Sequence, residues 1–286
     1  MDVRSLAGKW VLVTGAGSGI GRETALACAR RGAQLALCDL DAAGLAETER
    51  LLRAAAGTRG ASEPRVVTQR VDVAKPDEMG AFAEAVHREA RAVDLLVNNA
   101  GVGLGASFLD TTLADWRWIV DINLLGVVHG CHFFVPKMVE RGAGGHVVNV
   151  ASAAGYLPSE LLAAYTATKY AVLGLSEALH IELHRHGIGV TAICPGIINT
   201  GITRSARLRG AAAAEGAREA MVAGYQRRNY GPERVARNLL RAVQRNRVVA
   251  PVAIESWLAY YLKRLAPWAV HAMSRWQARH GFPGVP

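Results

Sequence analysis

The first chemistry that this sequence suggests comes from a serine, a tyrosine and a lysine. Tyr165 and Lys169 lie four positions apart in the segment Tyr-Thr-Ala-Thr-Lys, thirteen residues after Ser152. Side chains four apart share one face of a helix. A tyrosine is a poor base at neutral pH because its ordinary pKa is about 10, but a neighbouring ammonium group favours the phenolate. The three residues therefore predict that Tyr165 acts as a general acid/base.

A glycine-rich turn near the N-terminus adds weight to that prediction, because a tyrosine–lysine pair alone is common on helices. The apolar run Val11–Val13 leads into Gly15, Gly19 and Gly21, with the spacing GxxxGxG rather than GxGxxG. Glycines between a strand and a helix let the backbone approach a pyrophosphate, whose charge is stabilised at the helix N-terminus. The turn therefore predicts a nucleotide site.

Two further segments support a dinucleotide there. Asp39 ends the second apolar run, eighteen residues past Gly21, where a carboxylate can bind ribose hydroxyls and repel a 2′-phosphate. This favours NAD over NADP, although Arg22 and Arg30 could weaken the discrimination. The segment Asn98–Gly101 (Asn-Asn-Ala-Gly) follows another apolar run. It is either an ordinary turn or part of the edge where parallel sheets bind ligands.

Short apolar runs alternate with helical patterns along the chain, which is typical of βαβ units and a parallel sheet. The predicted strands are Trp10–Thr14, Gln34–Asp39, Val66–Val71, Leu95–Asn98, His146–Val150, Gly189–Cys194 and Val248–Val252. The predicted helices are Gly19–Arg31, Ala42–Ala56, Lys75–Ala90, Leu113–Arg141, Ala164–His186 and Pro232–Asn246. We find no internal repeat and no dividing linker. We therefore expect one doubly wound α/β domain over residues 1–252, with a substrate flap at about 201–230 and a helical extension over 253–286.

Composition argues against several other classes. The four cysteines form no CxxC pair, so neither a zinc site nor a disulfide framework is expected. The histidines His129, His132, His146 and His184 are interpreted as structural or solvated, and no metal is expected. No signal-peptide pattern and no run of about 18 apolar residues is visible. We therefore expect a cytoplasmic protein without a membrane span.

The positive charge is concentrated near the C-terminus. Residues 201–286 hold 15 of the 33 Lys and Arg residues but only 4 of the 24 Asp and Glu residues. Such a segment could meet an anionic ligand, a membrane surface or nucleic acid, or its arginines could lie on solvated helix faces. No recognisable nucleic-acid module accompanies the arginines, so nucleic acid is not expected as a partner.

Beyond residue 252 the sequence predicts an amphipathic helix that Pro267 breaks or kinks. Its apolar stripe consists of Ile254, Trp257, Leu258, Tyr261, Leu262 and Leu265, continued by Trp268, Ala272, Met273 and Trp276. The basic residues around it are Lys263, Arg264, Arg275 and Arg279. The pattern is compatible with peripheral contact to an anionic membrane. The alternative is that the stripe packs on the protein's own body or across a subunit interface.

Taken together and in this order, the motifs resemble those of the short-chain dehydrogenase/reductase family. They are Thr14-Gly-x-x-x-Gly-x-Gly21, Asp72, Asn98-Asn-Ala-Gly101, Asn123, Ser152, Tyr165-x-x-x-Lys169 and Pro195-Gly196. The resemblance covers about residues 6–252. It implies a Rossmann-like sheet of about seven parallel strands that binds a nicotinamide dinucleotide.

The resemblance also implies roles for individual residues. Ser152 would hydrogen-bond the substrate oxygen, Tyr165 would exchange a proton with it, and Lys169 would bind the nicotinamide ribose and lower the tyrosine pKa. Asn123 would hold a water that links Lys169 to solvent. The implied cofactor residues are Gly15, Ser18, Gly19, Ile20, Gly21, Asp39, Leu40, Asp72, Val73, Asn99, Ala100, Gly101, Tyr165, Lys169, Pro195, Gly196, Ile198 and Thr200.

The residues expected near the substrate are mostly apolar. They are Val102, Leu104, Tyr156, Leu157, Leu161, Leu162, Ile197 and Ile202, together with Ser152 and Tyr165. No arginine or lysine directly beside Ser152 or Tyr165 would grip a carboxylate or phosphate. This favours an NAD-dependent oxidoreductase acting on a lipophilic secondary alcohol or ketone.

Several other functions are compatible with the same sequence features. An epimerase, a dehydratase or an enoyl-type reductase of the same family would share the fold. A non-catalytic nucleotide-binding protein or a membrane-surface interaction protein would also keep it. The apolar helices Leu113–Arg141 and Ala164–His186 carry more apolar surface than one sheet face needs. In proteins that this sequence resembles, the matching helices pair across a twofold axis, so we expect a homodimer or homotetramer.

Overall fold

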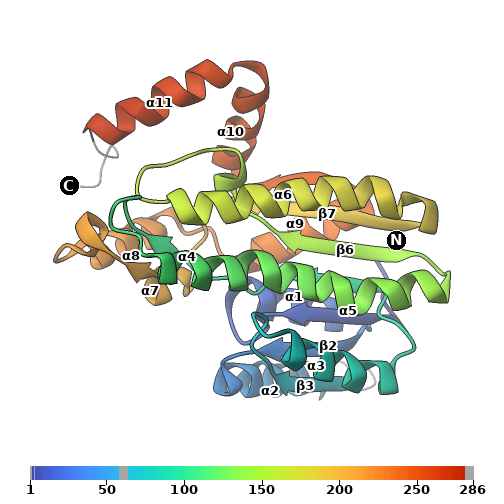
Figure 1. Cartoon of the computed structure of the whole chain (residues 1–286). Helices are drawn as coiled ribbons and strands as arrows, with labels where there is room; N and C mark the ends of the chain where they lie inside the picture. Colours follow the sequence, from blue (N-terminus) through green and yellow to red (C-terminus); the bar gives the residue numbers. More distant parts are fainter. Residues whose placement is uncertain (1, 3, 58–63, 281–286) are drawn as a thin grey trace.

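A seven-stranded parallel sheet forms the centre of the protein (Figure 1). The computed structural model describes residues 2, 4–57 and 64–280. The strands are β1 Trp10–Thr14, β2 Gln34–Asp39, β3 Val66–Arg70, β4 Leu95–Asn98, β6 Gly145–Val150, β7 Ile188–Pro195 and β9 Val249–Val252. Their order in the sheet is β3-β2-β1-β4-β6-β7-β9. The order reverses between β1 and β4, which confirms the doubly wound, Rossmann-like fold and puts the ligand crevice at that point.

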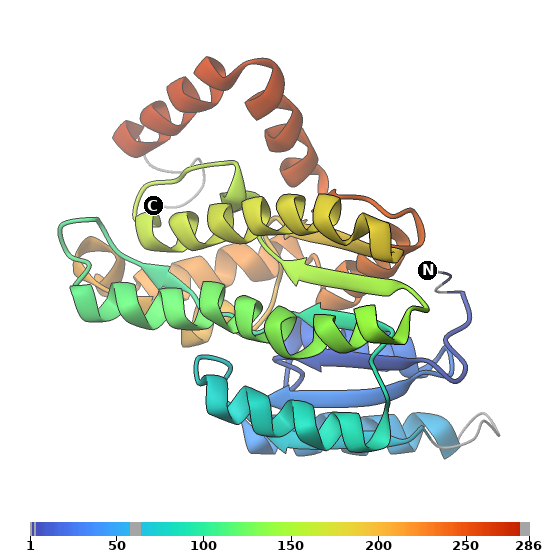
Figure 2. The same cartoon turned by 45° about the vertical axis from the view of Figure 1, so that its right-hand side comes forward.

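Helices cover both faces of the sheet (Figures 1 and 2). One face carries α1 Gly19–Ala29, α2 Ala42–Gly57 and α9 Pro232–Gln244, and the other carries α3 Pro76–Glu89, α5 Gly126–Arg141 and α6 Ala163–Leu183. Strands buried on both faces are nearly continuous apolar runs. The apolar runs of the sequence therefore predicted the positions of these strands well. α2 ends at Gly57, and residues 58–63 lie outside the described residues.

The helix predicted over residues 113–141 is a composite of three parts. α4, Leu113–Val120, continues through a π-helical turn, Asp121–Leu125, into α5. In that turn the Gly126 N–H donates to the carbonyl of Asp121, five residues back. By length and composition alone this stretch could cross a membrane, but it packs against α3, α6 and the sheet, as a core helix of a folded domain does. A π turn inside an α-helix often marks a functional position.

The predicted flap is an ordered unit beside the C-terminal ends of the strands. It contains α7 Ile202–Ser205, β8 Arg207–Leu208, a 3₁₀ turn Gly210–Ala213 and α8 Ala217–Arg228. Strand β8 pairs in parallel with β5, Leu104–Gly105. The guanidinium of Arg209 lies 3.1 Å from the buried carboxylate of Asp115, at the start of α4. These contacts fasten the flap to the rest of the domain.

The C-terminal extension forms a helical hairpin that stands away from the sheet (Figures 1 and 2). α10, Ile254–Leu265, ends before Pro267, where α11, Pro267–His280, begins. The break at Pro267 is therefore confirmed. Of the alternatives to membrane contact, packing of the apolar stripe on the protein's own body is wrong for most of the stripe, and packing across a subunit interface stays a prediction. α10 buries Ser256 and Ala259, whose small side chains allow close approach, and exposes its large apolar side chains Ile254, Leu258, Tyr261 and Leu265.

Candidate active site

The glycine-rich turn lies at the crevice between β1 and β4, where α1 begins. Gly15 has a φ of +65°, and a Cβ on it would lie 2.8 Å from the Cα of Ala100. A Cβ on Gly21 would lie 2.0 Å from the carbonyl oxygen of Gly15. Only glycine fits either position. The N–H groups of Gly19 to Gly21 lack intrahelical acceptors because they open α1, so they can bind an anion such as a pyrophosphate.

The Asn-Asn-Ala-Gly segment after β4 braces this turn. The side-chain amide of Asn99 donates to the carbonyl oxygens of Thr14 and Gly15, at 3.0 Å each. The Thr14 hydroxyl accepts from the N–H groups of Asn99 and Ala100, also at 3.0 Å each. These bonds tie the ends of the two strands that flank the crevice. The segment is therefore part of the ligand edge of the sheet.

Asp39, at the end of β2, points back to the glycine-rich turn. Its carboxylate accepts from the N–H of Gly17 at 2.7 Å and from the N–H of Asp41 at 2.9 Å. The nearby Arg22 is occupied by the carbonyl oxygens of Gly17 and Gly44 and by Thr48. Arg30 is exposed and follows the far end of α1, roughly 16 Å along the helix axis from its start. Two charges therefore contact Gly17 of the turn: the Asp39 carboxylate at its N–H and the Arg22 guanidinium at its carbonyl oxygen.

The other predicted cofactor residues line the same edge. Asp72 follows β3, and the N–H of the residue before it, Val71, donates to the carbonyl of Asp39. The Asp72 carboxylate accepts from the Ala74 N–H at 3.0 Å. Leu40 is exposed next to Asp39, whereas Val73 is buried.

The segment after β7 closes the crevice from the opposite side. Pro195 ends β7, and the N–H of Gly196 donates to the carbonyl of Val252. Ile198 is buried, and the side chain of Thr200 lies 3.5 Å from where a Cβ on Gly19 would be. Thr200 therefore lies against the glycine-rich turn although 181 positions separate them.

The structure brings the predicted catalytic serine and tyrosine together. Ser152 follows β6 in extended conformation and caps the short turn after it, while Tyr165 lies in the first turn of α6. Burial raises the pKa of Tyr165 to about 12, and the hydrogen bond from Ser152 opposes that shift. With that pKa, Tyr165 holds its proton at neutral pH.

Lys169 lies one helical turn further along α6. Its ammonium group donates to the Val150 carbonyl at 2.9 Å and is 5.7 Å from the centre of the Tyr165 ring. Burial lowers the pKa of Lys169 to about 8. Burial of the phenol, rather than the charge of Lys169, dominates the pKa of Tyr165. The expected lowering by Lys169 is not seen here and would need the additional positive charge of an oxidised nicotinamide.

Asn123 occupies the middle of the π-helical turn and is fully buried. Its side chain accepts from the N–H of Val102 at 2.8 Å and donates to the Val102 carbonyl at 3.0 Å. A longer contact of 3.4 Å joins it to the hydroxyl of Thr168, the residue before Lys169. A Cβ on Gly101 would lie 3.2 Å from Asn123 and 3.5 Å from the Lys169 nitrogen. Asn123 and Lys169 therefore flank the same glycine.

Comparison with known families agrees with this arrangement. The family described as short chain dehydrogenase matches residues 9–210. This chain belongs to the short-chain dehydrogenase/reductase family. The motifs identified from the sequence all lie within the matched region.

Individual members of the short-chain dehydrogenase/reductase family show the extent of the similarity. EphD of Mycobacterium tuberculosis, described as an oxidoreductase, is 40% identical over 269 residues, which are 93% of this chain but 44% of EphD. The chain thus spans less than half the length of this relative. Estradiol 17-beta-dehydrogenase 11 of Macaca fascicularis is 36% identical over 205 residues, 71% of this chain and 66% of that protein.

A solved structure supports the comparison at the level of the fold. A short-chain dehydrogenase/reductase from Burkholderia phymatum, in complex with NAD, is 33% identical with a TM-score of 0.81. The similarity covers 94% of this chain and 96% of that one. The glycine-rich turn of this chain fits such a dinucleotide, because Gly15 and Gly21 leave the backbone open and the N-terminus of α1 faces the crevice.

The predicted substrate residues fall into two groups. Leu104 is buried in an apolar cluster against which Val102 and Tyr165 pack, and Leu162 forms a bridge with Ala106 beside that cluster. Tyr156 and Leu157 belong instead to a cluster against α10, where the Tyr156 hydroxyl bonds to Ser256. Ile197 is partly exposed. The hydroxyl of Tyr156 therefore has a structural partner, and any substrate contact would come from its ring.

Two residues near the site were not identified from the sequence. The carboxylate of Glu255 accepts from the N–H of Ile197 at 3.1 Å and from Arg228 at 2.8 Å. The phenol of Tyr225, on α8, is close enough to Tyr165 to raise its pKa. Both come from the flap and the C-terminal extension, where no motif marks the residues, so only the tertiary structure reveals them.

Proposed function

We propose that this protein is an NAD-dependent dehydrogenase or reductase of lipophilic secondary alcohols and ketones. The observation that carries the proposal is the approach of the Ser152 and Tyr165 hydroxyls, with the Lys169 ammonium one turn further along the same helix. A bound nicotinamide would exchange a hydride with the substrate carbon. The protein's own residues would bind the substrate oxygen and move its proton.

In that mechanism the substrate oxygen binds between the hydroxyls of Ser152 and Tyr165. During ketone reduction Tyr165 donates its proton to the developing alkoxide, which suits a tyrosine whose pKa lies well above neutral. During alcohol oxidation Tyr165 must act as a phenolate, which the charge of Lys169 favours. Hydride transfer between the cofactor and a carbinol or carbonyl carbon, with the proton exchanged at its oxygen, uses Ser152, Tyr165 and Lys169 together. This supports a dehydrogenase or reductase over an epimerase, a dehydratase or an enoyl-type reductase.

The polar groups around the site favour an apolar substrate. The flap arginines Arg207 and Arg209 pair with Asp115, and Arg218 donates to backbone carbonyls within the flap. These cations are therefore already partnered and poorly placed to grip a substrate carboxylate. The related estradiol dehydrogenase acts, by its name, on an apolar polycyclic alcohol.

A series of 2-alkanols of increasing length tests this substrate class. We expect kcat/KM to rise with chain length, because each buried methylene contributes about 0.8 kcal/mol of binding, or roughly fourfold. A hydroxy acid of matched length should react more slowly. A preference for the charged substrate would contradict the proposal.

The cofactor preference is expected to depend on Asp39. Its carboxylate lies at the glycine-rich turn, 2.7 Å from the Gly17 nitrogen, where it would repel a 2′-phosphate. We expect the wild type to prefer NAD over NADP by about tenfold or more in kcat/KM, which corresponds to about 1.4 kcal/mol. Asp39→Ala should reduce this ratio, with Asp41→Ala as the neighbouring control. Equal use of both cofactors by the wild type would refute the assignment.

The pH dependence of the two directions should be opposite. Because Tyr165 has a raised pKa and is protonated at neutral pH, ketone reduction should be fastest at low pH and slow as the proton is lost. Alcohol oxidation needs the phenolate and should accelerate as the pH rises. Profiles of kcat/KM in both directions would check this. Parallel profiles would exclude proton exchange at Tyr165 as the controlling step.

Proteins of this family are typically oligomers, and we propose a homodimer or homotetramer here. Exposed apolar side chains on the helices from residue 113 to 141 and on α6 support such an interface, among them Leu125, Val128, Tyr170 and Ile181. Light scattering at micromolar concentration would measure the molar mass, and the mass of a monomer would contradict the proposed oligomer.

We further propose that the protein acts in the cytoplasm, in contact with a membrane through its C-terminal helices.

A further inference from the structure

The C-terminal hairpin exposes an unusual amount of apolar surface. The side chains of Leu265 and Trp268, at the bend between α10 and α11, are 82% and 74% exposed. We name the exposed apolar side chains of the two helices the hairpin crest: Ile254, Leu258, Tyr261, Leu265, Trp268, Met273 and Trp276. Contiguous exposed apolar surface of this kind marks an interaction site.

The spacing of the crest gives α10 one apolar side and α11 a broader apolar arc. On α10, Ile254, Leu258, Tyr261 and Leu265 follow at steps of four, three and four residues, and on α11 Trp268 and Trp276 lie eight apart. These steps return to the same side of an α-helix. The opposite side of α10 contacts the body through Ser256 and Ala259, so the hairpin has a fixed inner side and an uncovered outer one.

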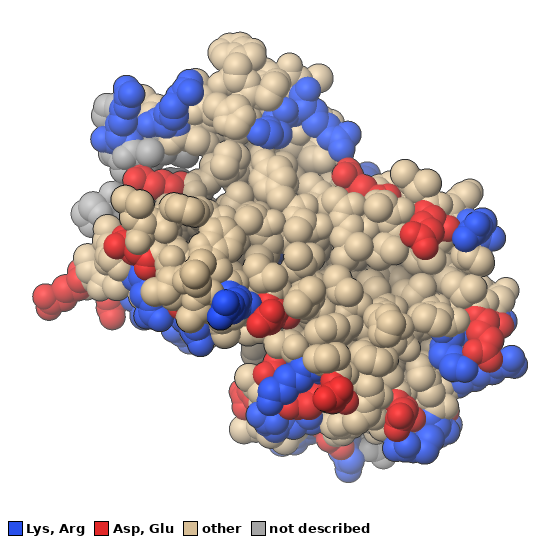
Figure 3. All heavy atoms as spheres, viewed as in Figure 1, with Lys and Arg blue, Asp and Glu red and all other residues tan. Residues whose placement is uncertain are grey.

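Beyond Glu255, in the first turn of α10, the charged residues of the hairpin are all basic. Residues 256–280 contain Lys263, Arg264, Arg275 and Arg279 and no Asp or Glu. In Figure 3 the hairpin at the top is mostly tan, with basic side chains at its flanks. Tyr and Trp side chains surrounded by Lys and Arg are typical of helices that lie at a membrane surface. The partner that this chemistry fits is anionic lipid.

A second copy of the chain fits the crest less well. In a twofold contact the same patch faces itself, so the cations of one hairpin would meet those of the other. The crest would then bury like charges without compensation. The apolar faces on α5 and α6 lie elsewhere and carry the proposed subunit contacts.

The base of the hairpin is linked to the active site. The buried hydroxyl of Ser256 donates to the Cys194 carbonyl at 2.7 Å and contacts the hydroxyl of Tyr156. One residue earlier, Glu255 binds the N–H of Ile197 and the flap residue Arg228. The first turn of α10 thus contacts the strand end, the segment after it and the flap.

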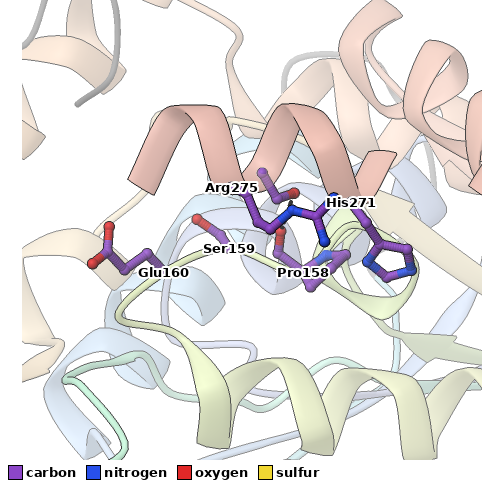
Figure 4. Close-up of a pocket in the computed structure, with 6 residues that line it drawn as sticks. Pro158, Ser159, Glu160, His271 and Arg275 are labelled. Atoms are coloured by element: carbon purple, nitrogen blue, oxygen red, sulfur yellow. Dashed lines mark hydrogen bonds between the residues drawn. The ribbon is translucent and has the colours of Figure 1, made fainter. Parts of the chain in front are cut away.

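α11 lies over the loop that leads into α6. The hydroxyl of Ser274 donates to the Pro158 carbonyl at 3.0 Å. A hollow of about 450 Å³ separates the helix from this loop (Figure 4), and it is lined by Pro158, Ser159, Glu160, His271, Ser274 and Arg275. The loop lies between Ser152 and Tyr165 in the sequence, so α11 contacts the segment that joins the two proposed catalytic residues.

We propose that the α10–α11 hairpin docks on an anionic bilayer surface through its crest and presents the active-site entrance to lipid, from which an apolar substrate can enter. The docking part stands on the crest and its charges alone. The delivery part rests on the proposed function. Burying the crest in the interface would remove its apolar surface from water, and the basic residues would bind lipid headgroups.

Sedimentation of the full-length protein with vesicles tests the docking. We expect binding to phosphatidylcholine vesicles that contain phosphatidylglycerol, much weaker binding to phosphatidylcholine alone, and release as salt rises. The crest variant, which combines Leu258→Ser, Leu265→Ser and Trp268→Ser, should not sediment with the vesicles. Because these side chains are exposed, the variant should keep its melting temperature.

A matched pair of charge reversals separates the lipid headgroup effect from net charge. Arg275→Glu with Arg279→Glu should weaken binding about tenfold or more. Arg88→Glu with Arg91→Glu, at the C-terminal end of α3 and just after it, makes the same change in net charge and should bind as the wild type does. If the full-length protein stays in the supernatant at low salt, or if both pairs weaken binding equally, docking through the crest is wrong. If the crest variant instead changes the oligomeric state, a second copy covers the crest.

The delivery part has its own readout. Anionic vesicles should lower the KM for a long apolar alcohol in the wild type and not in the crest variant, while leaving the KM for a small alcohol unchanged. Vesicle binding without any dehydrogenase activity would refute the proposed function but not docking through the crest. Dehydrogenase activity without vesicle binding would refute docking through the crest but not the proposed function.

Discussion

Replacing Tyr165 by phenylalanine is expected to lower kcat by about 10²- to 10⁴-fold, the usual contribution of a general acid/base. The change removes the hydroxyl that meets Ser152 and keeps the ring that packs on the apolar cluster around Leu104. NADH affinity should therefore stay near that of the wild type. Steady-state rates together with NADH fluorescence titration would measure both quantities.

A matched control separates the proton transfer from a general disturbance of the site. Tyr170→Phe changes a partly exposed tyrosine five residues along the same helix and should leave kcat unchanged. If Tyr165→Phe keeps more than about a tenth of the wild-type kcat, far less than general acid/base catalysis contributes, Tyr165 is not the catalytic acid/base.

Replacing Lys169 by methionine is expected to reduce both the rate and the affinity for NAD. The Lys169 ammonium lies 5.7 Å from the centre of the Tyr165 ring. Its loss removes the charge that favours the phenolate, and it also removes a group that is proposed to bind the nicotinamide ribose. The loss in kcat should be about 10²-fold or more. Steady-state kinetics and cofactor titration would separate the two effects, and a change in only one would contradict the double role.

The same variant should not be unstable. Burial lowers the pKa of Lys169 from 10.5 to about 8, so the charged form costs the folded state on the order of 3 kcal/mol at neutral pH. The lost hydrogen bond to Val150 offsets about 1 kcal/mol of that. The folded pKa lies below the unfolded one, so wild-type stability should rise from this group as the pH increases from 8 to 10.5. Lys169→Met should thus keep or raise the melting temperature at pH 7, and a large fall would mean that its inactivity reflects unfolding.

The sheet and the cofactor edge could be predicted from the sequence because local rules determine them. Each buried parallel strand is an apolar run, and the positions of Gly15 and Gly21 admit no side chain. Asp39, Asn99 and Thr200 could then be placed at the same edge of the sheet, because each comes at or shortly after the carboxyl end of a parallel strand. The assignment of roles to these residues remains a prediction that the experiments above address.

Other features depended on contacts that the sequence does not reveal. The π-helical turn at Asn123 has ordinary helix-forming neighbours, so the pattern predicted one continuous helix. The stripe on α10 has the same spacing whether it faces the core or solvent, and the small residues Ser256 and Ala259 decided its orientation. The bonds from Glu255 to Ile197 and from Tyr156 to Ser256 join residues 58 and 100 positions apart, and no motif marks either pair.

The most direct test of the proposed reaction follows the near-ultraviolet absorbance of NADH while an apolar secondary alcohol is added to the full-length protein and NAD. NADH should form in the wild type, and its rate should fall in Tyr165→Phe although that variant still binds NADH. No NADH formation across a broad panel of alcohols, and no NADH consumption with the matching ketones, by a protein that binds the cofactor would contradict the account.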